Sequence, residues 1–376
     1  MSAAWRNWQG WPALVAFAAA LALPISSAGP GPAYLVTLGG GVLVILLLIL
    51  FALFAATRAD AAAAGDFALF LGAHAGAALT LWLLPDVTGH VGPGFWGLAA
   101  TAWLLAWQLV TRLSFVRPTD RGTARLMRLL VPLLFGLWLL FVWEVVVRAA
   151  GIPFVLLPPP SAIWAKLIGS LPTVAADFRQ TFLKAVLAGY ILGSGSGFLV
   201  ALLVDRVPFL KRGLLPIGNL VSALPIIAVA PIMVMWFGFD WQSKAAVVVI
   251  MTFFPMLVNT VAGLAASDAM QRDLMRTYAA DHRQTLVKLR LPAALPFVFN
   301  GLKINTTLAL IGAIVAEFFG TPVVGMGFRI STEVGRMSID MVWAEIAVAA
   351  LAGSVFYGVM ALIERACTFW HPSFRN

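Results

Sequence analysis

Residues 274–296 read LMRTYAADHRQTLVKLRLPAALP, and this stretch decides the fold. Its first part is basic and polar, whereas the chain on both sides of it consists of long apolar runs. A helix that crosses a membrane needs about 20 apolar residues, and the flanking runs reach that length. The pattern therefore predicts a charged loop over about residues 267–296 between two membrane-spanning helices. Such a loop is either a plain connection or a binding site for a soluble partner.

The composition of the whole chain also indicates a membrane protein. Of its 376 residues, 61% are hydrophobic and 11% are charged. A soluble domain carries about 25% charged residues, so this chain has too little charge to cover a water-facing surface. In a membrane protein, a formal charge of +9 indicates basic cytoplasmic loops rather than a nucleic-acid partner.

The reactive side chains give no sign of an enzyme. The single cysteine, Cys367, excludes an internal disulfide and a thiolate metal site. The four histidines are scattered, without the spacing of metal ligands. We therefore expect no catalytic residues, no metal site and no cofactor bound by this chain.

The apolar runs predict an all-α polytopic membrane protein with about ten transmembrane helices. The first run resembles a signal peptide in length, but the many runs that follow favour a first membrane helix. The predicted spans cover residues 11–28, 33–56, 67–84, 93–111, 129–150, 180–204, 213–237, 245–265, 297–319 and 343–363.

The placement of lysine and arginine predicts the orientation. With the N-terminus in the cytoplasm, the inside loops hold most of the 25 basic residues, so both termini are expected inside. A basic stretch at 112–128 separates four N-terminal spans from six C-terminal ones. We predict one domain over 1–124, to which the sequence assigns no function, and a second over 125–376.

Two acidic residues in the charged loop have the spacing of helix starts. Asp268 precedes Gln271 by three residues, and Asp281 precedes Gln284 by three. In this pattern the acidic side chain accepts from free N–H groups of the first turn, and the glutamine reaches back. We therefore predict short helices at 269–278 and 282–291, joined at Ala279-Ala280.

Two prolines follow these helices. Pro292 is expected to end the second helix, and Pro296 to open the next membrane helix, where proline is tolerated. The alternative to a docking site is a helical hairpin that lies on the lipid headgroups, its basic side chains held by anionic lipid.

The loop resembles the EAA loop of permease subunits of binding-protein-dependent ABC importers. That pattern is Glu-Ala-Ala, three residues, Gly, nine residues, an aliphatic residue, any residue, then Leu-Pro. In this chain the acid, the aliphatic residue and Leu-Pro are kept, but both alanines and the glycine are replaced. The matching positions are Asp273, Leu274, Met275, Ala279, Leu289, Leu291 and Pro292, with Ala280 and Asp281 also in the resembling loop.

Further segments extend the resemblance over roughly 125–370, in the order expected for the family. LRLPAALPFVFNGLKI, at 289–304, is similar to the nitrate, sulfonate, taurine and pyrimidine-precursor branch. The other matching segments are 155–164, 222–244, 253–264 and 315–327.

The resemblance implies a type I ABC importer permease core built from the six C-terminal helices, in a bacterial plasma membrane. It implies a homodimer of this permease, two ATPase subunits that clasp the cytoplasmic loops, and a periplasmic or lipid-anchored substrate-binding protein. ATP and Mg²⁺ would bind the ATPase, because this chain lacks GxxxxGK[ST]. GSGSG at 193–197 has no lysine and lies in a predicted span, which favours close helix packing.

Polar residues inside predicted spans are candidates for a translocation pathway, because polar groups in hydrocarbon are costly and often functional. A Ser or Thr can instead bond to its own helix, an Asn can join helices, and Glu317 can form an interfacial salt bridge. The absence of a charged constellation suits a small neutral or weakly charged organic solute. The candidates are Asn219, Ser222, Asn259, Asn305, Thr306 and Glu317.

Two other classes of protein compete with an importer permease. A self-contained secondary transporter would need ionisable residues at mid-membrane, and Glu317, the acidic candidate, is off-centre. A membrane enzyme would need a convergent catalytic cluster, which the sequence does not show. Taurine, alkanesulfonates, nitrate, pyrimidines and riboflavin-like solutes all remain open as substrates, with a heterocyclic nutrient favoured.

Overall fold

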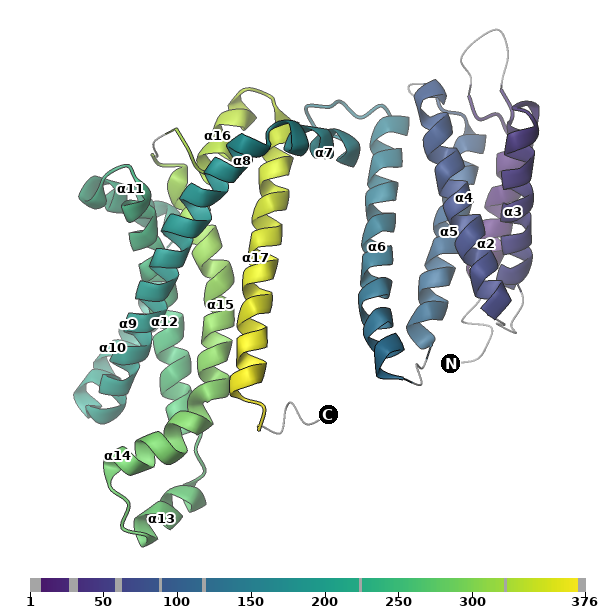
Figure 1. Cartoon of the computed structure of the whole chain (residues 1–376). Helices are drawn as coiled ribbons and strands as arrows, with labels where there is room; N and C mark the ends of the chain where they lie inside the picture. The colour runs from purple at the N-terminus through teal and green to yellow at the C-terminus, as the bar shows by residue number, and fades with distance from the viewer. Residues whose placement is uncertain are drawn as a thin grey trace. The chain divides into compact units, whose positions relative to one another are not determined.

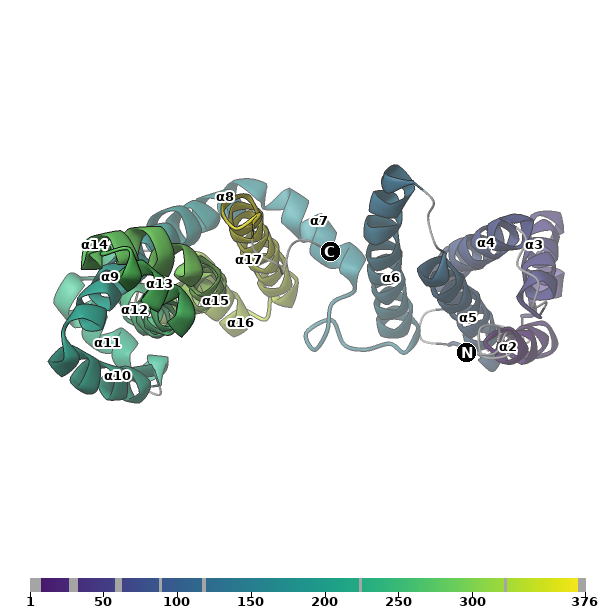
Figure 2. The ribbon, with the colours of Figure 1, turned by 90° about the horizontal axis from the view of Figure 1, so that it is seen from below.

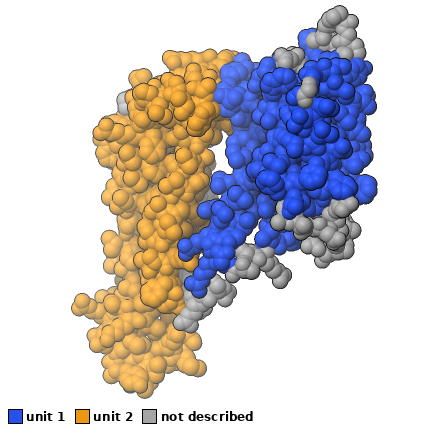
Figure 3. Space-filling model, turned by 45° about the vertical axis from the view of Figure 1, so that its right-hand side comes forward, with its two compact units in different colours: residues 1–162 blue, residues 163–376 orange. Residues whose placement is uncertain are grey.

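The computed structural model describes residues 8–26, 33–57, 63–87, 90–116, 120–222, 225–320 and 323–370. These residues form helices and connecting turns, and their β-structure is limited to isolated bridges from Ser26 to Ala33 and Val91. The chain divides into two compact units, Met1–Ala162 and Ile163–Asn376 (Figure 3). Each unit has its own arrangement of helices.

The first unit is a bundle with one continuous apolar core, formed by residues such as Leu69, Phe95 and Leu98. Arg112 satisfies helix-end groups there: it pairs with Asp66 at 3.3 Å and donates to the carbonyl of Ala55 at 3.1 Å. Its helices are α2 (Gly10–Ala22), α3 (Gly40–Thr57), α4 (Ala63–Val87), α5 (Pro93–Phe115) and α6 (Arg121–Ala149), with a 3₁₀ turn η1 (Leu35–Thr37).

The second unit is a bundle around α12, which lies between α9 and α15 (Figure 2). One end of this unit holds α8 and α16, and the opposite end holds α13 and α14 (Figure 1). The division between the units falls within α7 (Pro160–Gly169). The described elements that follow are α8 (Leu171–Phe178), the π-helix η2 (Arg179–Val186), α9 (Leu187–Arg206), α10 (Pro208–Ser222), α11 (Ile226–Phe237), α12 (Trp241–Ala265), α13 (Ala269–Thr277), α14 (His282–Thr285), the π-helix η3 (Leu286–Arg290), α15 (Leu291–Glu317), α16 (Met326–Gly335) and α17 (Ile339–Cys367).

Helices α9 and α12 touch through glycine, as the GSGSG motif predicted. A side chain at Gly193 would lie 2.1 Å from Thr252 Oγ1 and 2.8 Å from the carbonyl oxygen of Val249. A side chain at Gly197 would lie 2.4 Å from the carbonyl oxygen of Phe253. Small residues at such contacts let helix backbones approach closely inside a membrane.

This contact predicts a sharp difference between neighbouring glycines. Gly193→Val forces the helices apart, so we expect it to lower the free energy of unfolding by about 1–3 kcal/mol, as overpacking does. Gly195 has no atom of another element within 4 Å, so Gly195→Val is the matched control and is expected to change little. Thermal unfolding of both variants in detergent tests the prediction. Equal unfolding temperatures for the two would contradict it.

The predicted fold class is confirmed. Six described helices are long and apolar enough to span a membrane, and three shorter apolar helices accompany them. The predicted single span at 213–237 is wrong, because the chain forms two helices there, α10 and α11. Pro225 is the N-cap of α11 and has an extended backbone conformation, so α11 begins after it. The structural division falls after Ala162, while the predicted boundary of the permease domain at 124/125 stays a prediction.

Candidate functional site

The charged loop forms two short helices at one end of the second unit (Figure 1). The predicted N-caps are confirmed: Asp268 accepts from the amide of Met270 at 3.2 Å, and Asp281 accepts from the amide of Gln284 at 2.6 Å. The Gln284 side chain accepts in return from the amide of Asp281 at 3.0 Å, which completes a capping box. These caps fix where each helix begins.

The turn between α13 and α14 is left-handed. Ala279 has φ +53°, a conformation that favours glycine. Its amide donates to the carbonyl of Arg276 at 2.9 Å, and the amide of Ala280 donates to the carbonyl of Met275 at 2.9 Å. This pair of bonds is a Schellman motif, whose C′ position is usually glycine. The loop geometry therefore gives a physical reason for the glycine that the EAA pattern places where this chain has Ala279.

Ala279→Gly is expected to make this turn more stable. It removes a left-handed backbone strain of about 1–2 kcal/mol. The greater conformational freedom of glycine in the unfolded chain offsets about 0.5–1 kcal/mol of this stabilisation. Hydrogen exchange at the amides of residues 279 and 280 should slow several-fold relative to wild type. Faster exchange at these amides would show that the turn is not the left-handed one described.

The predicted stop at Pro292 is wrong. The helix runs without interruption from His282 to Glu317, through the π-helical turn η3. Pro292 lies in the first turn of α15, directly after η3, and Pro296 lies inside α15. Proline has no N–H to donate, and its position directly after the π turn is where the chain accommodates it without ending the helix. The loop is thus continuous with a membrane helix.

The loop has one set of apolar side chains that is exposed and another that packs against the bundle. Met270 and Leu274 on α13 and Tyr278, the C-cap of this helix, recur every fourth residue, and their exposed fractions are 77%, 56% and 78%. Leu286 and Leu291 instead pack against a buried cluster of the bundle. Of the predicted loop residues, Asp273, Leu274, Ala279 and Asp281 are exposed, and Met275, Ala280, Leu289, Leu291 and Pro292 are half-buried.

Two of the predicted pathway residues bond within the bundle. Asn305 is fully buried, and its amide donates to Ser194 Oγ at 2.9 Å and to the carbonyl of Thr252 at 2.7 Å. Asn305 therefore joins α15 to α9 and α12. The hydroxyl of Thr306 donates to the carbonyl of Lys303, on its own helix, at 2.7 Å. These are the packing roles that compete with a pathway role.

Asn259 is the more accessible candidate. Its amide donates to the carbonyl of Pro255 at 2.8 Å, and its oxygen accepts from the side chain of Asn300, an exposed residue, at 3.1 Å. This half-exposed pair offers polar groups on the surface of α12 and α15. Asn219 and Ser222 lie on α10, but their side chains fall outside the described part of the chain.

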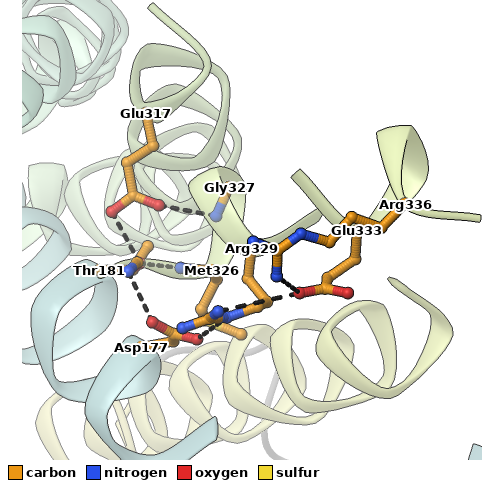
Figure 4. Close-up of polar contacts among 9 residues, drawn as sticks. Asp177, Thr181, Glu317, Met326, Gly327, Arg329, Glu333 and Arg336 are labelled. Carbon is orange, nitrogen blue, oxygen red and sulfur yellow. Dashed lines mark hydrogen bonds and ion pairs between the residues drawn. The ribbon is translucent and has the colours of Figure 1, made fainter. Parts of the chain in front are cut away.

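Glu317 holds the start of α16 at the other end of the unit (Figure 4). Its carboxylate accepts from the Thr181 hydroxyl at 2.7 Å and from the Gly327 amide at 2.7 Å. The Thr181 hydroxyl oxygen also accepts from the amide of Met326 at 2.8 Å. These side chains satisfy amides at the start of α16, which a helix leaves without internal partners. The carboxylate is buried, and its described hydrogen-bond partners are a hydroxyl and an amide. The interfacial salt bridge considered for Glu317 is not among its described contacts.

Asp177 extends this group of contacts, which we call the α16 clamp: Asp177, Thr181, Glu317 and Arg329. Asp177 accepts from the Gly325 amide at 2.7 Å and pairs with Arg329 at 2.8 Å. The hydrogen bond to Asp177 raises the pKa of Arg329 above its ordinary value. Sequence reasoning missed Asp177 and Thr181. Their signal is the i, i+4 spacing, which places both on one helix face in a membrane-length segment.

Comparison with known proteins shows the family of the chain. Residues 185–368 match the model of the binding-protein-dependent transport system inner membrane component family. The chain is also 33% identical over 241 residues to the formylaminopyrimidine transport permease protein ThiX of Halalkalibacterium halodurans, which covers 64% of this chain and 96% of that protein. The chain belongs to this family of ABC importer permeases.

Other relatives of this permease fall in the branch that the sequence predicted. It is 29% identical over 236 residues to the riboflavin transport system permease protein RibX of Chloroflexus aurantiacus, covering 62% of this chain and 88% of that one. It is 28% identical over 238 residues to the putative aliphatic sulfonates transport permease protein SsuC of Bacillus subtilis, covering 62% and 85%.

These findings confirm the predicted function over the secondary-transporter alternative. The chain is a multi-pass inner-membrane permease of a binding-protein-dependent ABC importer for a small nutrient. The family is one of transport permeases, not of enzymes.

Proposed function

We propose that the α13–α14 loop is the coupling element on which an ATPase subunit seats. The support is geometric: the two helices are capped, their turn is closed by a Schellman motif, and α13 with its C-cap presents exposed Met270, Leu274 and Tyr278. An amphipathic helix that lays such a stripe into a groove is a common mode of protein recognition. Because α14 continues into α15, movement of the loop would move a membrane helix, a rigid-body switch between two states.

The same proposal covers the other components of the importer and the orientation of the permease. ATP and Mg²⁺ bind the ATPase subunits, and the permease works as a homodimer that receives substrate from a periplasmic or lipid-anchored binding protein. The permease domain occupies 125–376, with both termini in the cytoplasm and lipid around the spans. The α13–α14 loop then lies inside, as its basic residues favour.

The substrate class that we favour is a heterocyclic nutrient. The support is the similarity to permeases named for formylaminopyrimidine and riboflavin. Within the bundle, the Asn259–Asn300 pair supplies the most accessible polar groups for a pathway, with Asn219 and Ser222 as further candidates. The contacts of Asn305, Thr306 and Glu317 favour structural roles for these three.

Purification in mild detergent tests the coupling role. An ATPase subunit should copurify with the wild-type permease and be lost with Ala279→Glu, which adds a bulky charge beside the docking stripe. Ala279→Gly is the matched control, because glycine suits the left-handed turn, and it should keep the ATPase. If no ATPase accompanies the wild type, the loop is a lipid-facing hairpin and the proposal fails.

A further inference from the structure

A bidentate ion pair lies where the coupling loop meets the bundle. Arg290, at the end of η3, donates from its two terminal nitrogens to the two oxygens of Asp205, at 2.8 and 2.7 Å. The side chains are 16% and 9% exposed, so the pair is largely shielded from solvent. Two parallel bonds between a guanidinium and a carboxylate fix orientation as well as distance.

The same guanidinium reaches a third helix. Arg290 Nε donates to the carbonyl of Leu264 at 3.1 Å, near the C-terminal end of α12. The last carbonyls of a helix have no partner within it, so this bond satisfies one of them. Asp205 lies one residue before the end of α9. A single side chain therefore connects the ends of α9 and α12 to the start of α15.

Apolar packing surrounds this connection. Leu264 and Ala294 are fully buried in one cluster, against which Leu202, Leu286 and Leu291 pack. The cluster draws residues from α9, α12, η3 and α15, which are the elements that the ion pair links. A shielded charge that loses its partner is left uncompensated, which costs free energy. Separating Asp205 from Arg290 would leave both charges in this condition, so the closed pair is the favoured state.

We infer that Asp205 and Arg290 are positioning residues for energy coupling: they form a joint that stays closed through the transport cycle and passes the displacement of the α13–α14 loop to α9 and α12. The inference rests on the proposed coupling role of that loop. Without the joint, the ATPase still binds and hydrolyses ATP, but the loop moves α15 without carrying the neighbouring helices.

Transport and ATP hydrolysis, measured together on the full complex in liposomes, test the joint. For Asp205→Asn and Arg290→Lys we expect ATPase copurification and hydrolysis close to wild type, and about tenfold less substrate moved per ATP, within the usual range of coupling between sites. Combining Asp205→Arg with Arg290→Asp should recover a large part of this ratio. The control is Glu364→Gln, which breaks the shielded 2.7 Å pair between Lys303 and Glu364 outside the joint. It should lower thermal stability and leave the ratio unchanged.

Cross-linking separates a closed joint from a gate that opens. In a Cys367→Ser background, Asp205→Cys and Arg290→Cys are bridged with a bis-methanethiosulfonate reagent about as long as the ion pair. Bridged protein should transport at close to the wild-type ratio, and transport blocked by the bridge would overturn the inference. An unchanged ratio in Asp205→Asn and Arg290→Lys would overturn it as well. Loss of ATPase from the wild type would instead refute the proposed function of the loop, so the two failures are distinct.

Discussion

Replacing Asp177 with alanine should lower the free energy of unfolding of the second unit by about 3–5 kcal/mol, because it breaks a buried ion pair from one side. Asp177 is fully buried, and its partner Arg329 is 17% exposed. The substitution leaves the Arg329 guanidinium without its closest acceptor and the Gly325 amide without a bond. Thermal unfolding and susceptibility to SDS, both in detergent, measure the loss.

The control for Asp177→Ala is a more exposed ion pair a few residues after Arg329 in the chain. Arg336 pairs with Glu333 at 3.2 Å, but the Arg336 side chain is 67% exposed. Exposed pairs contribute about 0–1 kcal/mol, so Arg336→Ala should shift the unfolding temperature little. Similar losses for the two variants would mean that Asp177 is not shielded as described.

Glu317→Ala should cost about 2–4 kcal/mol of unfolding free energy, because it leaves the buried Gly327 amide unpaired and removes the acceptor of the Thr181 hydroxyl. The start of α16 would then lose its bond to α15 and keep the bond from the Met326 amide to Thr181 of η2. Glu317→Gln keeps one acceptor oxygen for the amide, and its NH₂ group can donate to the Thr181 oxygen. We therefore expect Glu317→Gln to lose less than half of what Glu317→Ala loses in the same unfolding assay.

The glutamine variant also separates structure from transport. If Glu317 only anchors α16, folded Glu317→Gln protein in liposomes with its partners should transport at a rate close to wild type. A folded variant that hydrolyses ATP normally yet fails to transport would show that the charge itself takes part, and the pathway role would then be favoured over the anchor.

The features that the sequence predicted well depend on neighbours in the chain. The caps at Asp268 and Asp281 need only a side chain and the amides two or three residues ahead. The packing of GSGSG follows from the size of glycine. The membrane fold follows from the length of apolar runs, which is also a local property.

The features that sequence reasoning missed depend on tertiary structure. Asp177 meets Arg329 across 152 residues, and Asp205 meets Arg290 across 85, so neither pair has a local pattern. The passage of the helix through Pro292 was missed because the π turn before it has no local sequence pattern, while the packing of Leu286 and Leu291 against the bundle is tertiary. The side-chain contacts of Asn305 and Glu317 likewise required the positions of other helices.

The glycine contact between α9 and α12 has a mechanical consequence. Two slender rods that can slide along each other bend separately, whereas two rods fixed along their length resist bending as a single thicker beam. Gly193 and Gly197 bring the backbones of α9 and α12 together over a full turn, and the Thr252 and Val249 atoms next to Gly193 block sliding. A force applied at one end of this pair therefore reaches the other end as a tilt of the whole beam rather than being lost in flexing along its length.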